Sequence, residues 1–480
     1  MKHIAPYCPT RRAFLSDVGM GFTGLALGSM LAADPLSGEA LAKTASRIAP
    51  KAKSVIWLFM VGGVSHMEGF DPKPALNKYA GKSLAETPVK DPFESPFVKK
   101  NFRPAGDVNQ LRSFRQVILP MQIGYRNRGE SGIEVSDWWP HVGECIDDIA
   151  VVRSMWTSDN NHTAQLQFHT GRHFSDGAFP TIGSWVHYGL GRLNDNLPQF
   201  IALGTPIKSS FGPQVHSANY LGRAHDGVHV DEKEPLPFGS PAGRISKQEQ
   251  RLNAEMISRL NRLTAAEYPD DSALQARIKS YELAFRMQTS IPDIFDLRDE
   301  TAKTLEAYGD GFGRQLLAAR RFVQKGVRFV QVYHGTDDLD GAGGWDAHFF
   351  LKENHTKNCL AADKPIATLL KDLKQRGMLD ETLVVWASEF GRTPGTEESN
   401  GRDHHPFGFS IWMAGGGIQG GITHGTTDEL GMLADEDPHY VTDIHATILT
   451  QLGVDLHTME VPGRKRLDFE FGRPIQEIIA

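Results

Sequence analysis

The chain has 480 residues, of which 40% are hydrophobic and 23% are charged, and its formal net charge at pH 7 is −7. This mild acidity argues against a nucleic-acid-binding groove or a patch that attaches to anionic membranes. Cys8 lies near the N-terminus, and the two cysteines further along, Cys145 and Cys359, are too few for a disulfide framework or a multi-cysteine zinc site, although one bridge between them stays possible.

Residues 1–42 have the features of a twin-arginine export signal. The pair Arg11-Arg12 precedes an apolar stretch at 18–33, which four glycines make only modestly hydrophobic, as in a signal peptide rather than a membrane span. A small-residue cleavage site follows at Ala40-Leu41-Ala42. The alternative is an amphipathic N-terminal helix, but an arginine pair at this distance from such a stretch favours the signal. We therefore expect the twin-arginine translocase as a partner during export, and a periplasmic or extracellular location.

Continuous apolar runs recur along the rest of the chain, and each predicts a strand buried on both faces. They are residues 54–60, 149–154, 200–203, 327–333, 383–387 and 409–414. Helical patterns at 316–324 and 365–375 precede two of them. Strands alternating with helices predict an α/β fold whose largely parallel central sheet is covered by helices on both faces. In such sheets, ligands bind at the loops where the strands end.

The domain organisation follows from length and composition. About 150 residues per domain would give about three domains, but matching linkers are missing, so we expect one domain over residues 43–480. Residues 82–138, rich in Pro, Asn, Arg and Lys, predict an irregular excursion or a surface-covering loop. Residues of about 246–306 predict a helical insertion packed on the sheet rather than a separate module. Its apolar residues at helical spacing are Leu252, Met256, Leu260 and Leu263.

Histidines and carboxylates gather in four segments that follow three predicted strands, those at 54–60, 327–333 and 383–387. Imidazole and carboxylate together form a nitrogen and oxygen site that suits a divalent cation such as zinc, manganese or calcium. Because these loops can converge at one edge of the sheet, we expect a shared metal centre. The candidate ligands are His66, Asp346, His348, Glu389 and His404.

Each element taken alone has a plainer explanation. A single histidine after a strand commonly caps it or forms a hydrogen bond, and Asp403 fits a turn. Asp346 and His348 make a better pair, because side chains two residues apart on an extended loop face the same way. For the same reason His404 and His405 should face opposite sides, so at most one of them should bind. Four such elements together favour the metal site.

Seven segments carry a resemblance to a known family: residues 70–74, 160–162, 169–172, 345–348, 389–394, 401–404 and 443–449. They include Trp345-Asp346-Ala347-His348 and Gly401-Arg402-Asp403-His404. On these segments the chain resembles the DUF1501 family of exported bacterial proteins, which looks distantly related to sulfatases and alkaline phosphatases. The resemblance covers nearly all of the mature chain. It implies an alkaline phosphatase/sulfatase-like fold and a metal-dependent hydrolase of sulfate or phosphate esters.

The same resemblance shows where ligands of the wider superfamily are missing. Glu389 would occupy the position of a metal-binding aspartate, but Phe390 stands where a histidine or asparagine ligand belongs. The first strand ends in Gly62-Gly63 where sulfatases place an aspartate, which leaves His66 or Glu68 as substitutes. These departures favour a second hypothesis, a catalytically degenerate binding or scaffold protein of the cell envelope. The surviving histidines and carboxylates favour the enzyme.

The resemblance also bears on the nucleophile. Asn161 or His162 occupies the place where type I sulfatases carry the cysteine that becomes formylglycine, so formylglycine chemistry is not expected. A hydroxyl of Thr163 or Ser158 could attack instead, activated by a metal. Alternatively, a metal-bound hydroxide attacks and His162 acts as general base. We therefore place catalysis at residues 161–163 and expect an anionic small-molecule or glycan ester as substrate, with no nucleic acid.

Overall fold

The computed structural model describes residues 49–89, 91–104, 117–204, 212–231, 247–269, 271–335, 344–397, 400–455, 459–461 and 472–480. The predicted export signal lies outside the described residues. Within these ranges every helix is too short or too polar to cross a lipid bilayer.

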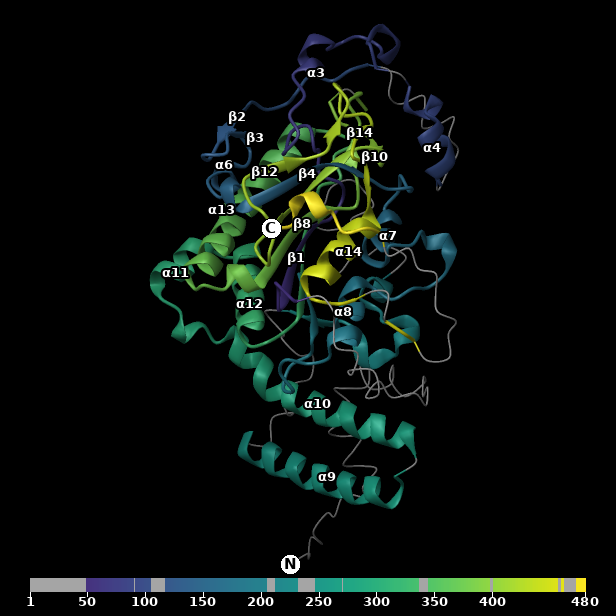
Figure 1. Ribbon diagram of the computed structural model, residues 1–480. Coiled ribbons are helices and arrows are strands. Elements are labelled where there is room, and N and C mark those ends of the chain that lie inside the picture. Colours follow the sequence, from purple (N-terminus) through teal and green to yellow (C-terminus); the bar gives the residue numbers. More distant parts are fainter. Residues whose placement is uncertain are drawn as a thin grey trace, which may run out of the picture.

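A central sheet forms the middle of the molecule (Figure 1). Its strands are β1 (Ser54–Met60), β4 (Ile149–Trp156), β5 (Phe200–Leu203), β6 (Val228–Val230), β7 (Phe329–His334), β8 (Thr382–Ser388), β11 (Phe409–Ala414), β12 (Ile422–His424) and β15 (His439–Tyr440). The spatial order is β12-β4-β11-β8-β1-β7-β5-β6, and β15 also pairs with β4. All of these pairs are parallel except those that β11 makes with β4 and β8. The predicted α/β class with a largely parallel sheet is therefore confirmed.

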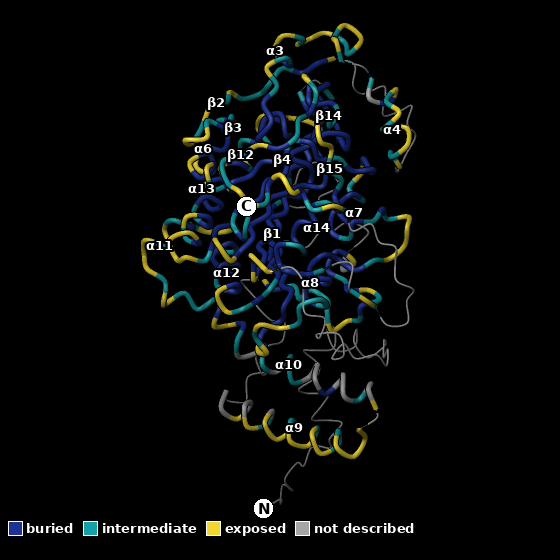
Figure 2. The backbone as a smooth tube through the Cα atoms, in the orientation of Figure 1, coloured by how far each residue is buried: buried dark blue, intermediate teal, exposed yellow. Residues whose placement is uncertain are grey.

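Helices cover both faces of the sheet, as the sequence predicted. One face packs against α10 (Ser272–Phe295), α12 (Phe312–Gln324) and α13 (Leu351–Gln375). The other packs against α7 (Ala164–Thr170), α8 (Ile182–Leu190) and α14 (Val441–Gln451). In β1, Ile56 and Leu58 face the first layer, whereas Val55 and Trp57 face the second, and all four are buried. Figure 2 shows this buried interior.

The predicted helical insertion contains α9 (Lys247–Glu267) and α10, which form a hairpin that extends below the body in Figure 1. Packing of α9 on the sheet is a wrong prediction, because Leu252, Met256, Leu260 and Leu263 are 48–70% exposed. Among the side chains of this hairpin that the structure describes, those of Met287, Ile291 and Ile294 on α10 belong to the core. The reason is the hairpin connection, which places α10 between α9 and the body. Helical periodicity predicted the helix but could not identify what covers its apolar face.

The predicted excursion at 82–138 is made of short elements. They are α4 (Pro96–Asn101), β2 (Tyr125–Arg128) and β3 (Ile133–Ser136), with further residues of this stretch outside the described ranges. Phe93 and Val98 pack against Phe407, so this part of the excursion covers the surface beside the loop that carries His404. Cys145 and Cys359 are both buried as free thiols, so they form no bridge with each other.

The remaining α-helices and strands of the described chain are short. They are α3 (Ala75–Lys78), α6 (Pro140–Gly143), α11 (Ala302–Tyr308), β9 (Gly391–Arg392), β10 (His404–His405), β13 (Thr426–Thr427) and β14 (Ala434–Glu436).

Candidate metal centre

The chain brings the loop after β7 against the end of β1 by a close backbone approach. Gly62 has a φ of 116°, and a Cβ there would lie 2.5 Å from the backbone nitrogen of Asp346. The backbone nitrogen of Trp345 donates to the carbonyl of Val61 at 2.8 Å. Glycine is therefore required at position 62, because only glycine permits both this conformation and this contact.

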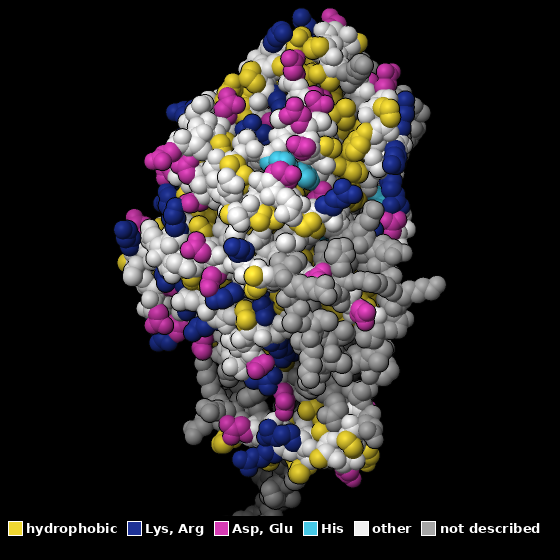
Figure 3. Space-filling model, viewed as in Figure 1, with side chains coloured by type: hydrophobic (Ala, Val, Ile, Leu, Met, Phe, Trp, Pro, Cys, Tyr) yellow, Lys and Arg dark blue, Asp and Glu magenta, His cyan; other side chains and the backbone are white. Residues whose placement is uncertain are grey.

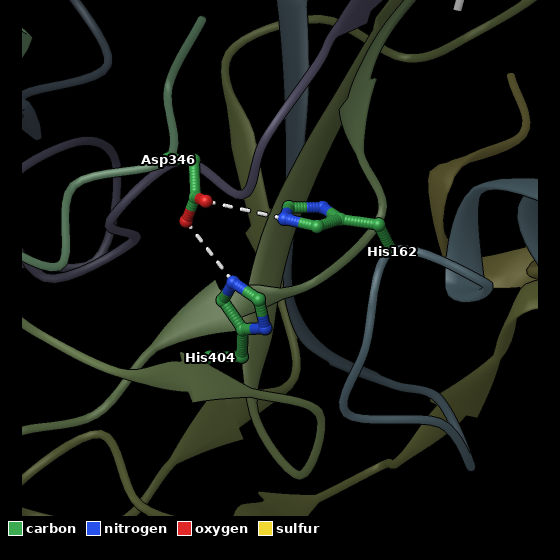
Figure 4. Close-up of side chains that lie close together, drawn as sticks. All are labelled: His162, Asp346 and His404. Carbon is green, nitrogen blue, oxygen red and sulfur yellow. Dashed lines mark hydrogen bonds and ion pairs between the residues drawn. The ribbon is translucent and has the colours of Figure 1, made fainter. Parts of the chain in front are cut away.

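Asp346 lies at the centre of the site (Figure 4). Its Oδ2 atom is 3.2 Å from Nε2 of His162. Its Oδ1 atom is 3.0 Å from Nε2 of His404 and 3.0 Å from Nε2 of His348. One carboxylate thus joins three imidazoles that come from three separate loops.

His404 is positioned by the short antiparallel pair β9–β10, in which it lies opposite Arg392. Its Nδ1 atom is 2.9 Å from the carbonyl of Asn160, so that nitrogen must carry the hydrogen and donate it. Burial lowers the pKa of His404 to about 4, so the ring is neutral at pH 7. The lone pair on Nε2 then faces the carboxylate of Asp346, an arrangement that a cation would stabilise.

His162 connects Asp346 to Glu389. Its Nδ1 atom lies 3.1 Å from Oε1 of Glu389, which is completely buried and also accepts the backbone N–H of Gly62 at 2.8 Å. Burial alone would lower the pKa of His162, but hydrogen bonds to the two carboxylates raise it to about 10. Without a metal, His162 is therefore an imidazolium that donates to both.

His348 has a comparable arrangement on the other side of Asp346. Its Nδ1 atom is 2.6 Å from Oε2 of Glu397, and its Nε2 atom is 3.0 Å from Nε2 of His404. Burial opposes protonation of His348, but Asp346 and Glu397 raise its pKa to about 9. A carboxylate that fixes the outer nitrogen of an imidazole is the usual support of a metal-binding histidine.

Arg392 supplies a completely buried positive charge next to the carboxylate of Asp346. Its guanidinium donates to Oδ1 of Asp346 at 2.6 Å and also to the carbonyls of Gly62 and Gly63. Burial alone would raise the pKa of Asp346, but Arg392 and the histidines hold it well below its usual range. Arg392 therefore fixes Asp346 as a carboxylate and ties it to the end of β1.

Two overlapping groups of side chains could hold a metal here: His162, Asp346 and His404, or His348, Asp403 and His404. Within each group the ligand atoms lie within 4.8 Å of one another. Because Asn160 engages Nδ1 of His404, only Nε2 is left for a cation, and one imidazole nitrogen binds one ion. The groups are therefore alternatives. Their nitrogen and oxygen donors fit zinc or another borderline divalent cation.

The structure thus brings three of the predicted site residues, His162, His348 and His404, around Asp346, and Glu389 joins them through His162. His66 lies apart: its Nε2 atom is 2.9 Å from the carbonyl of Gly431, and within the described part of the chain it belongs to no candidate metal group. His405 bonds to the carbonyl of Met432 at 2.6 Å, on a different side from His404.

The two neighbours of His162 occupy different positions. Asn161 is exposed and its side-chain oxygen accepts the backbone N–H of His162 at 2.7 Å. Thr163 donates its hydroxyl to Oδ2 of Asp159, a fully buried carboxylate.

Sequence reasoning missed the contributions of Arg392, Glu397 and Asp403. Asp403 lies beside a predicted ligand, so its position was the available signal, although a turn explained it equally well. Arg392 belongs to a segment that carried the family resemblance. Glu397 gave no local signal, because its role depends on a loop that folds back onto His348.

Solved structures similar to this chain include the sulfatase PsFucS1 from Pseudoalteromonas sp. (12% identity, TM-score 0.34, 91% of this chain and 72% of that one). Another is the alkaline phosphatase of the Antarctic bacterium TAB5 (12% identity, TM-score 0.33, 85% of this chain and 99% of that one). A third is Ps i-CgsB in complex with k-i-k-neocarrahexaose (10% identity, TM-score 0.35, 84% of this chain and 72% of that one). The search of curated proteins found no match. A family model described as "Protein of unknown function (DUF1501)" matches residues 52–479. The chain therefore belongs to the DUF1501 family.

Proposed function

We propose that this protein is an exported, metal-dependent hydrolase of sulfate or phosphate esters that works without a formylglycine nucleophile. The observation that carries the proposal is the buried carboxylate of Asp346, which lies between His162 and His404. The unprotonated Nε2 atom of the neutral His404 ring points toward this carboxylate. Such a cluster is costly to bury unless a cation or an ion pair balances it.

In this proposal His162, Asp346 and His404 hold a divalent cation, with zinc, manganese and calcium as the candidates. Glu389 orients His162 through its outer nitrogen, as carboxylates do behind metal-binding histidines. When bound, the cation would neutralise the negative charge of an ester oxyanion and stabilise the charge that develops in the transition state. The sequence suggested His162 as a general base, whereas this proposal assigns it the role of a metal ligand.

Thr163 is the nucleophile that the surrounding contacts support best. Its hydroxyl donates to Asp159, and burial raises the pKa of that carboxyl group, which makes Asp159 a stronger proton acceptor. Asp159 would take the proton as the hydroxyl oxygen of Thr163 forms a bond to the sulfur or phosphorus of the ester and the alcohol leaves. Water would then release sulfate or phosphate from Thr163 and restore the hydroxyl. The substrate class is an anionic small-molecule or glycan ester.

Metal binding by matched variants tests the proposal. Chelator-treated protein is titrated with zinc, manganese and calcium, and turnover is measured on a panel of aryl sulfates and phosphates. His404→Ala removes a ligand, so it should bind the preferred metal at least ~10-fold more weakly and lose turnover. His66→Gln is the control, because His66 lies outside the cluster, and it should match wild type in both assays. Equal metal binding by wild type and His404→Ala would show that this site holds no metal.

Two observations favour the alternative, a degenerate binding or scaffold protein of the cell envelope. The guanidinium of Arg392 already supplies Asp346 with a positive partner at 2.6 Å, and Phe390 packs against His404 with ring centroids 4.4 Å apart. If the wild type binds metal but turns over no ester on the panel, this alternative replaces the enzyme.

A further inference from the structure

A second group of metal-ligand side chains lies at one edge of the sheet, on residues that the proposed hydrolase does not use. His424, His439 and Glu477 place their ligand atoms within 4.8 Å of one another. His424 ends β12, which is the outermost strand on this side, and His439 begins β15. Figure 3 shows histidine side chains beside acidic ones on the surface over β12.

The two histidines converge because β12 and β15 pair with the same strand. His424 lies opposite Val152 and His439 lies opposite Met155, both on β4. The side chains of the two histidines turn toward each other, with the two Nε2 atoms 2.8 Å apart. Two imidazole nitrogens at this separation must share a hydrogen, unless a cation is bound by both.

A carboxylate supports the outer nitrogen of His439. Oδ2 of Asp443, in the first turn of α14, lies 2.9 Å from Nδ1 of His439. Oδ1 of Asp443 accepts the backbone N–H of Arg473 at 2.9 Å, so the carboxylate is held from both sides. This hydrogen bond favours a proton on Nδ1 and leaves the Nε2 lone pair for a ligand.

The third ligand comes from the C-terminal residues, which run along β12. Glu477 belongs to the 3₁₀-helix η11 (Gln476–Ile478), which is anchored by the buried side chains of Ile475 and Ile478. The backbone N–H of Gln419 donates to the carbonyl of Ile478 at 2.8 Å. Oε2 of Glu477 lies 3.8 Å from Nε2 of His424, and the Glu477 side chain is 60% exposed. A small rotation of this surface side chain would bring its oxygen into coordination range.

We propose that His424, His439 and Glu477 bind one zinc ion that fastens the C-terminal residues to the edge of the sheet. Two imidazoles and one carboxylate form a common set of protein ligands for zinc, with a fourth position left for water. Asp443 is the positioning residue for His439. This site shares no residue with the proposed hydrolase centre, so it stands or falls independently of that function.

The test compares zinc stoichiometry and thermal unfolding in four variants of the full chain. His424→Gln/His439→Gln should bind one zinc fewer per chain than wild type, and Glu477→Gln and Asp443→Asn should bind this zinc roughly 10–100-fold more weakly. His141→Gln removes a surface histidine outside all candidate metal groups of the described residues and serves as the matched control. Zinc should raise the unfolding temperature of wild type and His141→Gln more than that of the double variant.

Two outcomes separate this proposal from the hydrolase. His404→Ala should retain the zinc ion at the sheet edge, because His404 belongs to the other site. If the double variant and His141→Gln bind equal amounts of zinc with equal affinity, the sheet-edge site does not exist. Should the double variant fail to fold, Glu477→Gln decides the question alone, because its exposed side chain is dispensable for packing, and unchanged affinity in it overturns the proposal.

Discussion

At the scale of single residues, the proposed chemistry depends on which groups neutralise the negative charge of the buried Asp346 carboxylate. Three imidazoles and one guanidinium surround a single carboxylate. Its neighbours differ in charge: His404 is neutral because burial lowers its pKa to about 4, whereas carboxylate partners raise the pKa of His162 to about 10. Identical side chains thus have opposite protonation states within one cluster, because burial dominates the pKa of His404, whereas hydrogen bonds to two carboxylates outweigh burial at His162.

This difference predicts how the metal-free protein responds to pH. Folded His162 keeps its proton up to about pH 10, whereas an unfolded histidine releases it near pH ~6.5. The stabilisation is therefore fully present below pH ~6.5 and is lost as pH rises, by at most ~1.4 kcal/mol of unfolding free energy per pH unit for each such group. His348 contributes up to about pH 9. Denaturant unfolding in chelator at increasing pH measures the effect.

His162→Gln is the variant that identifies the source of this pH dependence. It should show a shallower loss of unfolding free energy between pH ~6.5 and ~10 than wild type. Bound zinc should reverse the sign in wild type, because ligating imidazoles must be deprotonated and metal affinity therefore rises with pH. An identical slope in wild type and His162→Gln would contradict the assignment of the raised pKa to this residue.

At the scale of elements, the site depends on the contact between the end of β1 and the loop after β7. The glycine at position 62 lets the backbone of Asp346 approach, and its own N–H donates to Glu389. One turn thus positions residues from two other strands. The site is built from strand ends, as expected for a parallel sheet, and its precision comes from this backbone contact.

Gly62→Ala and Gly81→Ala form a matched pair that tests this contact. Both glycines have a positive φ, so both substitutions carry a backbone strain of at least ~1 kcal/mol. The strain is larger at Gly62, because its φ of 116° lies further than the 77° of Gly81 from the left-handed region that other residues can adopt. A Cβ at Gly62 would lie 2.5 Å from the nitrogen of Asp346, whereas a Cβ at Gly81 would meet nothing within 4 Å. Gly62→Ala should therefore lose at least ~1 kcal/mol more unfolding free energy and bind metal at least ~10-fold more weakly. Equal behaviour of the two variants in denaturant unfolding and metal titration would show that the close approach is unimportant.

At the scale of the whole molecule, the described residues form three layers with the proposed hydrolase centre beyond the ends of β1, β7 and β8. The proposed zinc site lies at the β12 edge of the same sheet. Twin-arginine export carries proteins that have already folded, so the export signal predicted at Arg11-Arg12 would allow a metal centre to be loaded before export.

The export proposal predicts a change in location on substitution of the arginine pair. Arg11→Lys/Arg12→Lys keeps the charge but removes the residues that the translocase recognises, so the double variant should stay in the cytoplasm. Cell fractionation and the N-terminal sequence of the exported chain, expected to begin near Lys43, provide the measurement. Lys2→Ala is the control, because it leaves the pair intact. Normal export of the double variant would assign the leader to another route.

The sequence by itself determined the sheet strands that are long and continuously apolar. The limits of β1, β5 and β11 agree with prediction, because strands buried on both faces must be apolar at every position. It did not determine the start of α13. The sequence pattern predicted a helix that begins at Pro365, whereas α13 begins at Leu351 and continues through Pro365. A proline in a long helix removes only one hydrogen bond, which packing on the sheet outweighs.

Only the tertiary structure decided which polar residues meet. The sequence placed Asp346, His348 and His404 near strand ends, since chemistry gathers there in a parallel sheet. It could not exclude His66, or add Glu397 and Arg392, because those outcomes depend on how loops far apart in sequence fold over one another. The pair His424 and His439 was equally hidden, since β12 and β15 are too short to show a pattern and converge only through their shared contact with β4.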